Sequence, residues 1–459
     1  MSRLAIHWRT ELRETLTLAG PIVLNQVGHM SMGMVDTVVA GMISTTTLAG
    51  LGLAVNCFWT FTAVCQGSLL ALDTYFAQAV GARDDKALGR YLGQSFWACG
   101  FVTLASGALI ALAAGCYLAY APASAMREAF GLYIGNVFWC LPTLFVFFLL
   151  QRYWQARHRV KPFTVIILLA NVLNLVACCA LGLGKWGFPN FGVRGIAWAT
   201  VISRYAMVVA ALVFTWYQLR PRKLRLPAYD GAVQGQLFRL GLPAAGHTAL
   251  EIGAFTVATF VVGSLGSVPL AAHHVCLMMA AFTFMFPLGF SSAAAVRVGY
   301  FVGAGDPERA VAAGWLAIGV AVSCMAVFAL MYVAIPGVLL KVFTRDAAVV
   351  EVGSKILMVV ALFQIADGTQ VSTTGALRGL GDTRSPMISN LIGHYPIGLL
   401  TGLGLCFGLG YGVVGLWGGL ACGLISVALL LLRAWRRATR DLSRLQPVVE
   451  GLKRENVKT

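Results

Sequence analysis

Residues 247–255 read His-Thr-Ala-Leu-Glu-Ile-Gly-Ala-Phe, a mostly small and apolar run with one carboxylate, Glu251, at its centre. Apolar runs of this kind recur throughout the 459 residues, of which 58% are hydrophobic and only 11% are charged. In soluble domains about a quarter of the residues are charged. A helix of roughly 20 apolar residues is long enough to cross a bilayer. Because open sheets are excluded from lipid, the composition predicts an all-α integral membrane protein.

Twelve apolar segments are predicted to be transmembrane helices. They cover 16–40, 48–79, 92–119, 130–154, 163–184, 192–217, 238–263, 268–299, 311–335, 349–375, 386–408 and 412–434. The first segment is too long for the apolar region of a signal peptide and is therefore counted as a helix. The longest polar connection follows the sixth segment. We therefore expect an N-terminal six-helix lobe at 1–218, a cytoplasmic inter-lobe loop at 219–236, a C-terminal six-helix lobe at 237–434 and a basic cytoplasmic tail at 435–459.

The two sets of six segments repeat one another at an offset of about 222 residues. Under this offset Gly41 falls on Gly263, and residues 78–82, Gln-Ala-Val-Gly-Ala, fall on residues 300–304, Tyr-Phe-Val-Gly-Ala. An even number of helices in each half means that both halves enter the membrane from the same side. The sequence thus predicts a parallel repeat of two six-helix bundles, a plan in which transporters bind substrate in the cleft between the halves.

The net charge of +16 is explained by topology and not by a nucleic-acid partner. Most of the 34 Lys and Arg residues lie in every second loop and in the tail, around residues 83–90, 157–161, 220–225, 378–384 and 433–458. Cytoplasmic loops accumulate Lys and Arg. The N-terminus, the even-numbered loops and the C-terminus are therefore expected to face the cytoplasm.

Metal and disulfide chemistry is not indicated. The 11 cysteines lie almost entirely in apolar segments and form no CxxC pair, which is typical of buried thiols. His273 and His274 are adjacent, so on a helix they point in different directions and no carboxylate is spaced to join them. We expect neither a cofactor nor a resident metal.

Two polar groups are predicted within the first bundle. The first segment carries Asn25, His29, Met32 and Asp36 at spacings that place them on one helical face. The fifth segment carries Asn171, Asn174 and Cys178 in the same way. If these two helices pack together, Asp36 and Asn174 form a polar site.

The second bundle has its own polar set. Glu251 follows His247 by one helical turn, and Gln364, Asp367 and Gln370 share a face of the tenth segment. An ionised side chain at the centre of a membrane helix costs roughly 2.5 to 3.5 kcal/mol, so such a residue indicates function. The alternative is that each carboxylate only ties helices together by hydrogen bonds. Under the repeat Glu251 falls on His29, so the acids are not symmetric, which favours cation handling in the second half.

Three apolar side chains of the eighth segment, Met278, Phe282 and Phe286, admit two interpretations. They are either ordinary core residues or a soft wall that adapts to varied hydrophobic ligands.

Four motifs together resemble the multidrug and toxic compound extrusion (MATE) family, in its NorM-like branch. They are Val35-Asp36-Thr37-Val38-Val39-Ala40-Gly41, residues 78–82, Leu250-Glu251, and residues 375–384, Gly-Ala-Leu-Arg-Gly-Leu-Gly-Asp-Thr-Arg. The resemblance covers essentially the whole chain. It implies twelve helices in two lobes that form a V-shaped cleft, and export of hydrophobic, often cationic compounds coupled to H⁺ or Na⁺. The family's cation-linked acids map onto Asp36, Glu251 and Asp367.

The expected function is antiport by alternating access in a bacterial inner membrane, carried out by a monomer. Coupling would use H⁺ or Na⁺, with Na⁺ bound at Glu251 and Asp367 if it is the coupling ion. Ten further residues are expected either to contact the substrate or to support the cation site. They are Asn25, His29, Asn171, Asn174, His247, Met278, Phe282, Phe286, Gln364 and Gln370. A lipid-linked oligosaccharide flippase has a similar plan but should have a basic cavity. An enzyme is not expected, because no nucleophile and base lie together.

Overall fold

The computed structural model describes residues 2–219 and 228–449, with side chains from residue 9 onward. The basic residues at 220–225 and the end of the tail after residue 449 lie outside the described residues. Within the described ranges the regular elements are all helical. The prediction of an all-α chain is confirmed.

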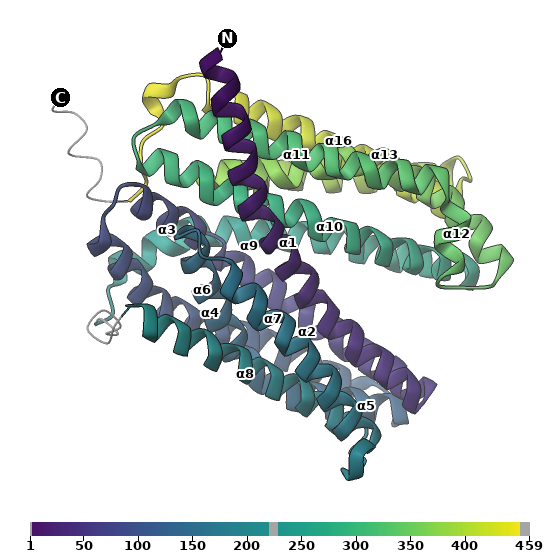
Figure 1. Cartoon of the computed structure of the whole chain (residues 1–459). Helices are drawn as coiled ribbons and strands as arrows, with labels where there is room; N and C mark the ends of the chain where they lie inside the picture. The colour runs from purple at the N-terminus through teal and green to yellow at the C-terminus, as the bar shows by residue number, and fades with distance from the viewer. Residues whose placement is uncertain (1, 220–227, 450–459) are drawn as a thin grey trace. The chain divides into compact units, whose positions relative to one another are not determined.

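The elements follow one another without long interruptions (Figure 1). They are α1 (Ser2–Ile43), α2 (Thr45–Leu69), α3 (Leu72–Gly81), α4 (Asp85–Tyr120), α5 (Ala125–Val137), η1 (Phe138–Cys140), α6 (Leu141–Ala156), α7 (Lys161–Ala177), η2 (Cys178–Gly182), η3 (Lys185–Gly187), α8 (Val193–Leu219), α9 (Gly231–Gly263), α10 (Ser267–Gly303), α11 (Pro307–Ala334), α12 (Pro336–Lys341), α13 (Ala347–Gly379), α14 (Arg384–Ile392), η4 (Gly393–Leu399), α15 (Leu400–Leu403), η5 (Gly404–Gly408), α16 (Gly412–Ala438) and η6 (Leu442–Arg444).

Each of the twelve predicted segments is helical over most of its length, and segment 48–79 is interrupted by a turn at residues 70–71 between α2 and α3. Eleven stretches of the described chain are long and apolar enough to cross a membrane, with α2 and α3 counted as one. The long helix α1 is not among the eleven, and its central stretch holds the polar stripe that contains Asn25, His29 and Asp36. The structure differs at the helix starts, because α1, α4 and α9 extend several residues into polar sequence before the apolar run begins.

The residues group by contact into two compact units. The amino-terminal unit contains residues 24–72 and 85–241, and the carboxy-terminal unit contains residues 1–23, 73–84 and 242–459. The predicted lobes follow chain order instead, and their boundaries stay a prediction. The boundary between the two units falls inside α1 and inside α9, next to Pro21 and Pro243. These two prolines occupy matching positions in the repeat. Proline removes a hydrogen bond inside a helix, so a change of partner at these points is physically reasonable.

In the amino-terminal unit, α8 packs against α5, α6 and α7. Trp154 of α6 is buried and donates its ring N–H to Thr215 of α8 at 2.9 Å. The Phe163 ring of α7 lies against Phe214 of α8, with the ring centres 6.1 Å apart. These contacts fix α8 as a central element of this unit.

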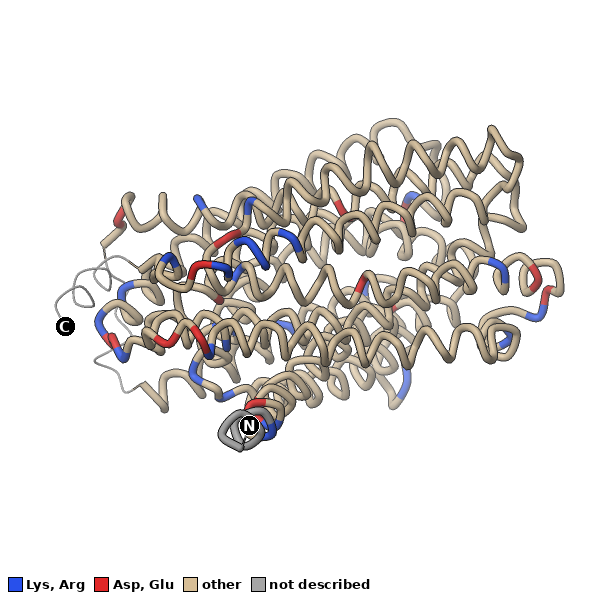
Figure 2. Tube along the Cα trace, turned by 90° about the horizontal axis from the view of Figure 1, so that it is seen from above, with Lys and Arg blue, Asp and Glu red and all other residues tan. Residues whose placement is uncertain are grey.

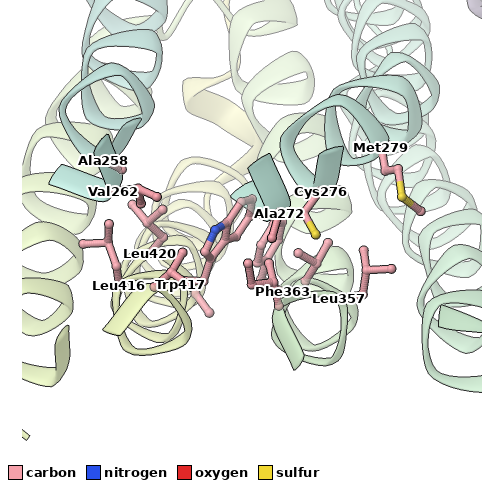
Figure 3. Packing of buried hydrophobic residues seen from close by; sticks show 14 of the residues in the cluster. Ala258, Val262, Ala272, Cys276, Met279, Leu357, Phe363, Leu416, Trp417 and Leu420 are labelled. Carbon is pink, nitrogen blue, oxygen red and sulfur yellow. The ribbon is translucent and has the colours of Figure 1, made fainter. Parts of the chain in front are cut away.

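In the carboxy-terminal unit, α13 packs against α10, α11 and α16. Figure 3 shows part of its core, where Trp417 and Phe363 lie among small and aliphatic side chains. Trp417 donates to Nδ1 of His273 at 3.1 Å, and Nε2 of His273 lies 2.9 Å from the Thr259 hydroxyl. His273 is therefore a core residue that uses both ring nitrogens. Among the described residues no group of three or more His, Cys, Asp or Glu could hold a metal ion.

The repeat is visible in the backbone of the carboxy-terminal unit. A Cβ atom on Gly81 of α3 would collide with the carbonyl oxygen of Tyr300 on α10, and one on Gly303 would collide with the carbonyl oxygen of Gln78. Residues 78–81 match residues 300–303 in the repeat, so the two contacts are equivalent. The shared glycines allow α3 and α10 to cross in direct backbone contact.

Charged residues are more frequent toward the ends of the helices and sparse along their middles (Figure 2). This distribution is expected for helices that cross a bilayer, where an ionisable group in the middle is costly. The few charged residues that do lie inside membrane helices therefore mark the places to examine for function.

Candidate functional site

The first polar cluster, in the amino-terminal unit, is centred on Asp36 of α1. Its carboxylate is only 1% exposed and accepts hydrogen bonds from Tyr133 of α5 at 2.7 Å and Thr200 of α8 at 2.6 Å. Asn174 of α7 and Cys178 of η2 also donate to it, each at 3.4 Å. The structure thus makes the predicted contact between Asp36 and Asn174. It adds Tyr133 and Thr200, which the sequence analysis missed because each is one of many polar residues in its helix.

Local helix geometry brings these donors together. The π-helical segment η2 begins at Cys178, directly after α7, and such segments often occur at functional sites. Asn174 also donates to the Thr200 hydroxyl at 3.2 Å, and together with Tyr133 of α5 these contacts join α1, α5, α7 and α8 at the carboxylate. An ionised carboxylate only accepts, whereas a protonated one must also donate. Binding of a proton to Asp36 would therefore change the hydrogen bonding of the cluster, because the carboxyl group would gain a donor that needs an acceptor.

The other polar residues of α1 lie apart from this carboxylate. Asn171 of α7 donates to the carbonyl oxygen of Gly28 at 2.9 Å and ties α7 to α1. Asn25 is fully buried, and its amide has no hydrogen-bond partner among the described residues. Nδ1 of His29 lies 3.2 Å from the guanidinium of Arg204. The polar residues predicted on one face of α1 therefore do not form a single site, because they have different surroundings.

Two buried arginines in the amino-terminal unit were missed by the sequence analysis. Arg204 of α8 is 4% exposed, and its guanidinium lies 5.4 Å from the ring centre of Trp59. Arg152 of α6 is 3% exposed and lies 4.3 Å from the ring centre of Phe148. An arginine inside an apolar segment is the same signal that singled out Glu251, so both could have been found from the sequence.

The second polar cluster, in the carboxy-terminal unit, joins Glu251 of α9 to Asp367 of α13 through one amide group. Nε2 of Gln370 donates to Glu251 at 2.9 Å and to Asp367 at 3.2 Å. Asp367 and Gln370 are buried, and Glu251 is partly buried. Three residues predicted on two separate segments are thus brought together, with Gln370 as the bridge.

The chemistry of this cluster suits a small cation. No Lys or Arg of the described chain forms an ion pair with Glu251 or Asp367, so two ionised carboxylates would repel one another here. The carbonyl oxygen Oε1 of Gln370 and the hydroxyl of Thr374, one turn further along α13, are buried without hydrogen-bond partners among the described residues. Carboxylate, amide and hydroxyl oxygens are the ligands that hard cations prefer. The same arrangement can accept a proton.

Two predicted neighbours of this cluster have other partners. Gln364 donates to the hydroxyl of Thr283 on α10 at 2.9 Å, away from the carboxylates. Nδ1 of His247 accepts from Asn390 of α14 at 3.1 Å. Tyr395 of η4 donates to the carbonyl oxygen of Leu250 at 3.3 Å and so reaches the backbone beside Glu251. Asn390 and Tyr395 were missed because nothing in their spacing relates them to α9.

The three apolar residues of α10 that were predicted as core or ligand wall also differ in their exposure. Met278 and Phe282 are exposed, at 48% and 42%, and the Phe282 and Phe286 rings lie edge to face at 6.0 Å. Phe286 packs against Phe328 of α11, with ring centres 4.8 Å apart. Phe286 is thus anchored within the unit, whereas Met278 and Phe282 present surface. Their role as a ligand wall stays a prediction.

Comparison with known proteins places the chain in a family. The MatE family model matches residues 21–179 and 243–403. The chain is 32% identical over 449 residues to the probable multidrug resistance protein NorM of Mesorhizobium japonicum, covering 94% of this chain and 95% of that protein. It is 33% identical over 435 residues to the multidrug resistance protein NorM of Burkholderia vietnamiensis, covering 92% and 93%.

A solved structure agrees on the fold. The crystal structure of the eukaryotic MATE transporter AtDTX14 is similar with a TM-score of 0.86 at 22% identity, covering 96% of this chain and 100% of that chain. The two blocks matched by the family model begin at residues 21 and 243, which agrees with the repeat offset found in the sequence. Members of this family are transporters and not enzymes. The chain belongs to the MatE family, that of the multidrug and toxic compound extrusion transporters.

Proposed function

We propose that this protein is a cation-coupled antiporter that exports hydrophobic, often cationic compounds across a bacterial inner membrane by alternating access. The observation that carries the proposal is the bridge from Glu251 through Gln370 to Asp367, which holds two carboxylates together in the apolar interior of one unit. The NorM relatives support multidrug compounds as the substrate class. They do not favour a lipid-linked oligosaccharide flippase.

The mechanism follows from the charges. A proton or Na⁺ that enters from outside binds at Glu251 and Asp367 and favours the state that releases the drug outward. A drug that enters from inside favours the state that releases the cation inward. Coupling of this kind requires that the two ligands stabilise different conformations or compete for the same charge.

The energy source depends on the number of cations moved per drug. The membrane potential supplies about 2.3 kcal/mol per elementary charge per 100 mV. Exchange of one H⁺ for one monovalent drug cation moves no net charge and draws only on the ion gradient. Exchange of two cations for one such drug also draws on the potential.

The test is dye efflux from proteoliposomes under an imposed pH gradient or an imposed Na⁺ gradient. We expect one of the gradients to drive ethidium transport by the wild type, and Glu251→Gln to abolish it. A matched control is Glu351→Gln, because Glu351 lies on α13 but is exposed and paired with Lys355 at 2.8 Å. Full gradient-driven efflux by Glu251→Gln would refute the proposal.

A further inference from the structure

Arg204 carries a buried positive charge for which the ion pairs of the described chain provide no contacting carboxylate. Its guanidinium contacts the Nδ1 atom of His29 at 3.2 Å and the face of the Trp59 ring at 5.4 Å. Both contacts are with neutral groups. Because an uncompensated charge inside a membrane helix is expensive, we expect a negative charge nearby, even without direct contact.

The register of α1 and α8 identifies that charge. Thr200 of α8 donates to Asp36 of α1, and Arg204, four residues later on α8, contacts His29, seven residues earlier on α1. The two helices thus run antiparallel along one polar column. Arg204 lies one helical turn, about 6 Å along the axis, from the residue that contacts Asp36.

Among the described residues, the carboxyl group that interacts electrostatically with Arg204 is that of Asp36. The titratable groups that interact electrostatically with Arg204 are Cys140, Asp36 and Tyr133. Thiols and phenols are ordinarily uncharged at neutral pH, whereas a carboxyl group can be ionised. The remaining titratable neighbour of Asp36, Cys178, is also a thiol.

His29 holds Arg204 without adding charge. A guanidinium only donates hydrogen bonds, so Nδ1 of His29 must accept, and the ring must be the neutral tautomer with its proton on Nε2. A protonated His29 would lose this hydrogen bond and place a second positive charge beside the first. Along α1 and α8 the column therefore contains one fixed positive charge, Arg204, and one titratable negative charge, Asp36, while a second buried arginine, Arg152 of α6, interacts electrostatically with His29.

We propose that Arg204 is a positioning residue for the Asp36 site, acting as the fixed counter-charge that keeps Asp36 ionised until a proton or another cation binds there. The column is then neutral when Asp36 is ionised and carries one net positive charge when Asp36 is protonated. The second state repels a cationic compound near this column, which links proton uptake to release of such a substrate. This consequence for transport rests on the proposed function, whereas the charge pairing does not.

The test is an infrared titration of the purified full-length protein, which needs neither substrate nor gradient. The carboxyl band of Asp36 is assigned by its absence in Asp36→Asn, and its midpoint is followed with pH. Removal of a unit charge at this separation shifts such a midpoint by roughly 1 to 2 pH units at an effective dielectric constant of about 20. The ionised form loses its partner, so we expect the midpoint in Arg204→Met to move upward by that amount.

Two further variants separate charge from packing. Arg204→Lys keeps the charge, so its midpoint should stay close to that of the wild type. Arg152→Met removes another buried arginine of the same unit, which lies over the Phe148 ring of α6 and interacts electrostatically with His29, and it should move the midpoint less than Arg204→Met does. If Arg204→Met does not fold, Arg204→Gln replaces it.

The outcomes are decisive either way. A midpoint in the uncharged Arg204 variant that moves no more than in Arg152→Met would overturn the proposal, as would an equal shift in Arg204→Lys. Loss of gradient-driven efflux in the wild type would overturn the proposed function but leave this titration, and hence the charge pairing, intact.

Discussion

At the scale of single residues, Gln370 decides how the two carboxylates of the carboxy-terminal unit meet. Its amide nitrogen donates to both Glu251 and Asp367, and only the NH₂ end of the side chain can satisfy two carboxylates. Replacement by leucine removes both hydrogen bonds and leaves the two carboxyl groups without a common partner. Loss of a hydrogen bond to a buried charged group costs about 1.5 to 3 kcal/mol.

We therefore expect Gln370→Leu to reduce gradient-driven dye efflux by roughly tenfold or more, since about 1.4 kcal/mol corresponds to a factor of ten. The matched control is Gln364→Leu on the same helix, because Gln364 is equally buried but donates to Thr283. Its efflux should depend on the ion gradient as in the wild type. Equal losses of gradient-driven efflux in both variants would show that α13 is sensitive to any such substitution. They would contradict a specific role for the bridge through Gln370.

The residues of the two clusters also show what a sequence can reveal. Glu251, Asp367 and Asp36 were predicted because a carboxylate in an apolar segment is conspicuous, and Gln370 because it shares a helical face with Asp367. Tyr133 and Thr200 were not predicted, because contacts between helices depend on register and rotation that no single segment encodes. Gln364 was expected beside Asp367, but a helical face is broad enough for its residues to contact different neighbours.

At the scale of elements, the crossing of α3 and α10 depends on two glycines. Backbone carbonyl oxygens occupy the positions where Cβ atoms of Gly81 and Gly303 would lie, so no side chain fits there without a shift of the helices. The predicted segment 48–79 was wrong in treating α2 and α3 as one continuous helix, because the break at Leu70 and Ala71 carries no proline or glycine signal. The helix positions were otherwise predictable, because the length of an apolar run follows the thickness of the bilayer.

Gly303→Ala should destabilise the protein, since overpacking of a close contact costs about 1 to 3 kcal/mol. Gly319→Ala on α11 is the matched control, because a Cβ atom at that position has no atom within 4 Å beyond its own helix. Alanine is favoured over glycine in a helix interior, so this control should leave stability unchanged or raise it. Thermal unfolding in detergent measures both, and a melting temperature of Gly303→Ala equal to that of the wild type would contradict the account of the crossing.

At the scale of the whole molecule, the basic loops of the amino-terminal unit agree with the predicted topology. Arg157, after α6, pairs with Asp85 at the start of α4 at 3.1 Å. Arg159 donates to Gln218 near the end of α8 at 2.7 Å. The first two even-numbered loops and the end of the sixth predicted helix thus lie at the same end of this unit, as they must if all are cytoplasmic. The orientation of that end stays a prediction.

The central claim for the molecule is that drug and cation compete through Glu251 and Asp367. Release of the coupling cation on addition of substrate tests it most directly. Purified protein in weak buffer is mixed with ethidium, and released protons are followed with a pH indicator, with radioactive sodium used in a parallel sample. We predict release of one of the two cations by the wild type and none by Glu251→Gln. Substrate binding without release of either cation, or equal release by the variant, would contradict the account.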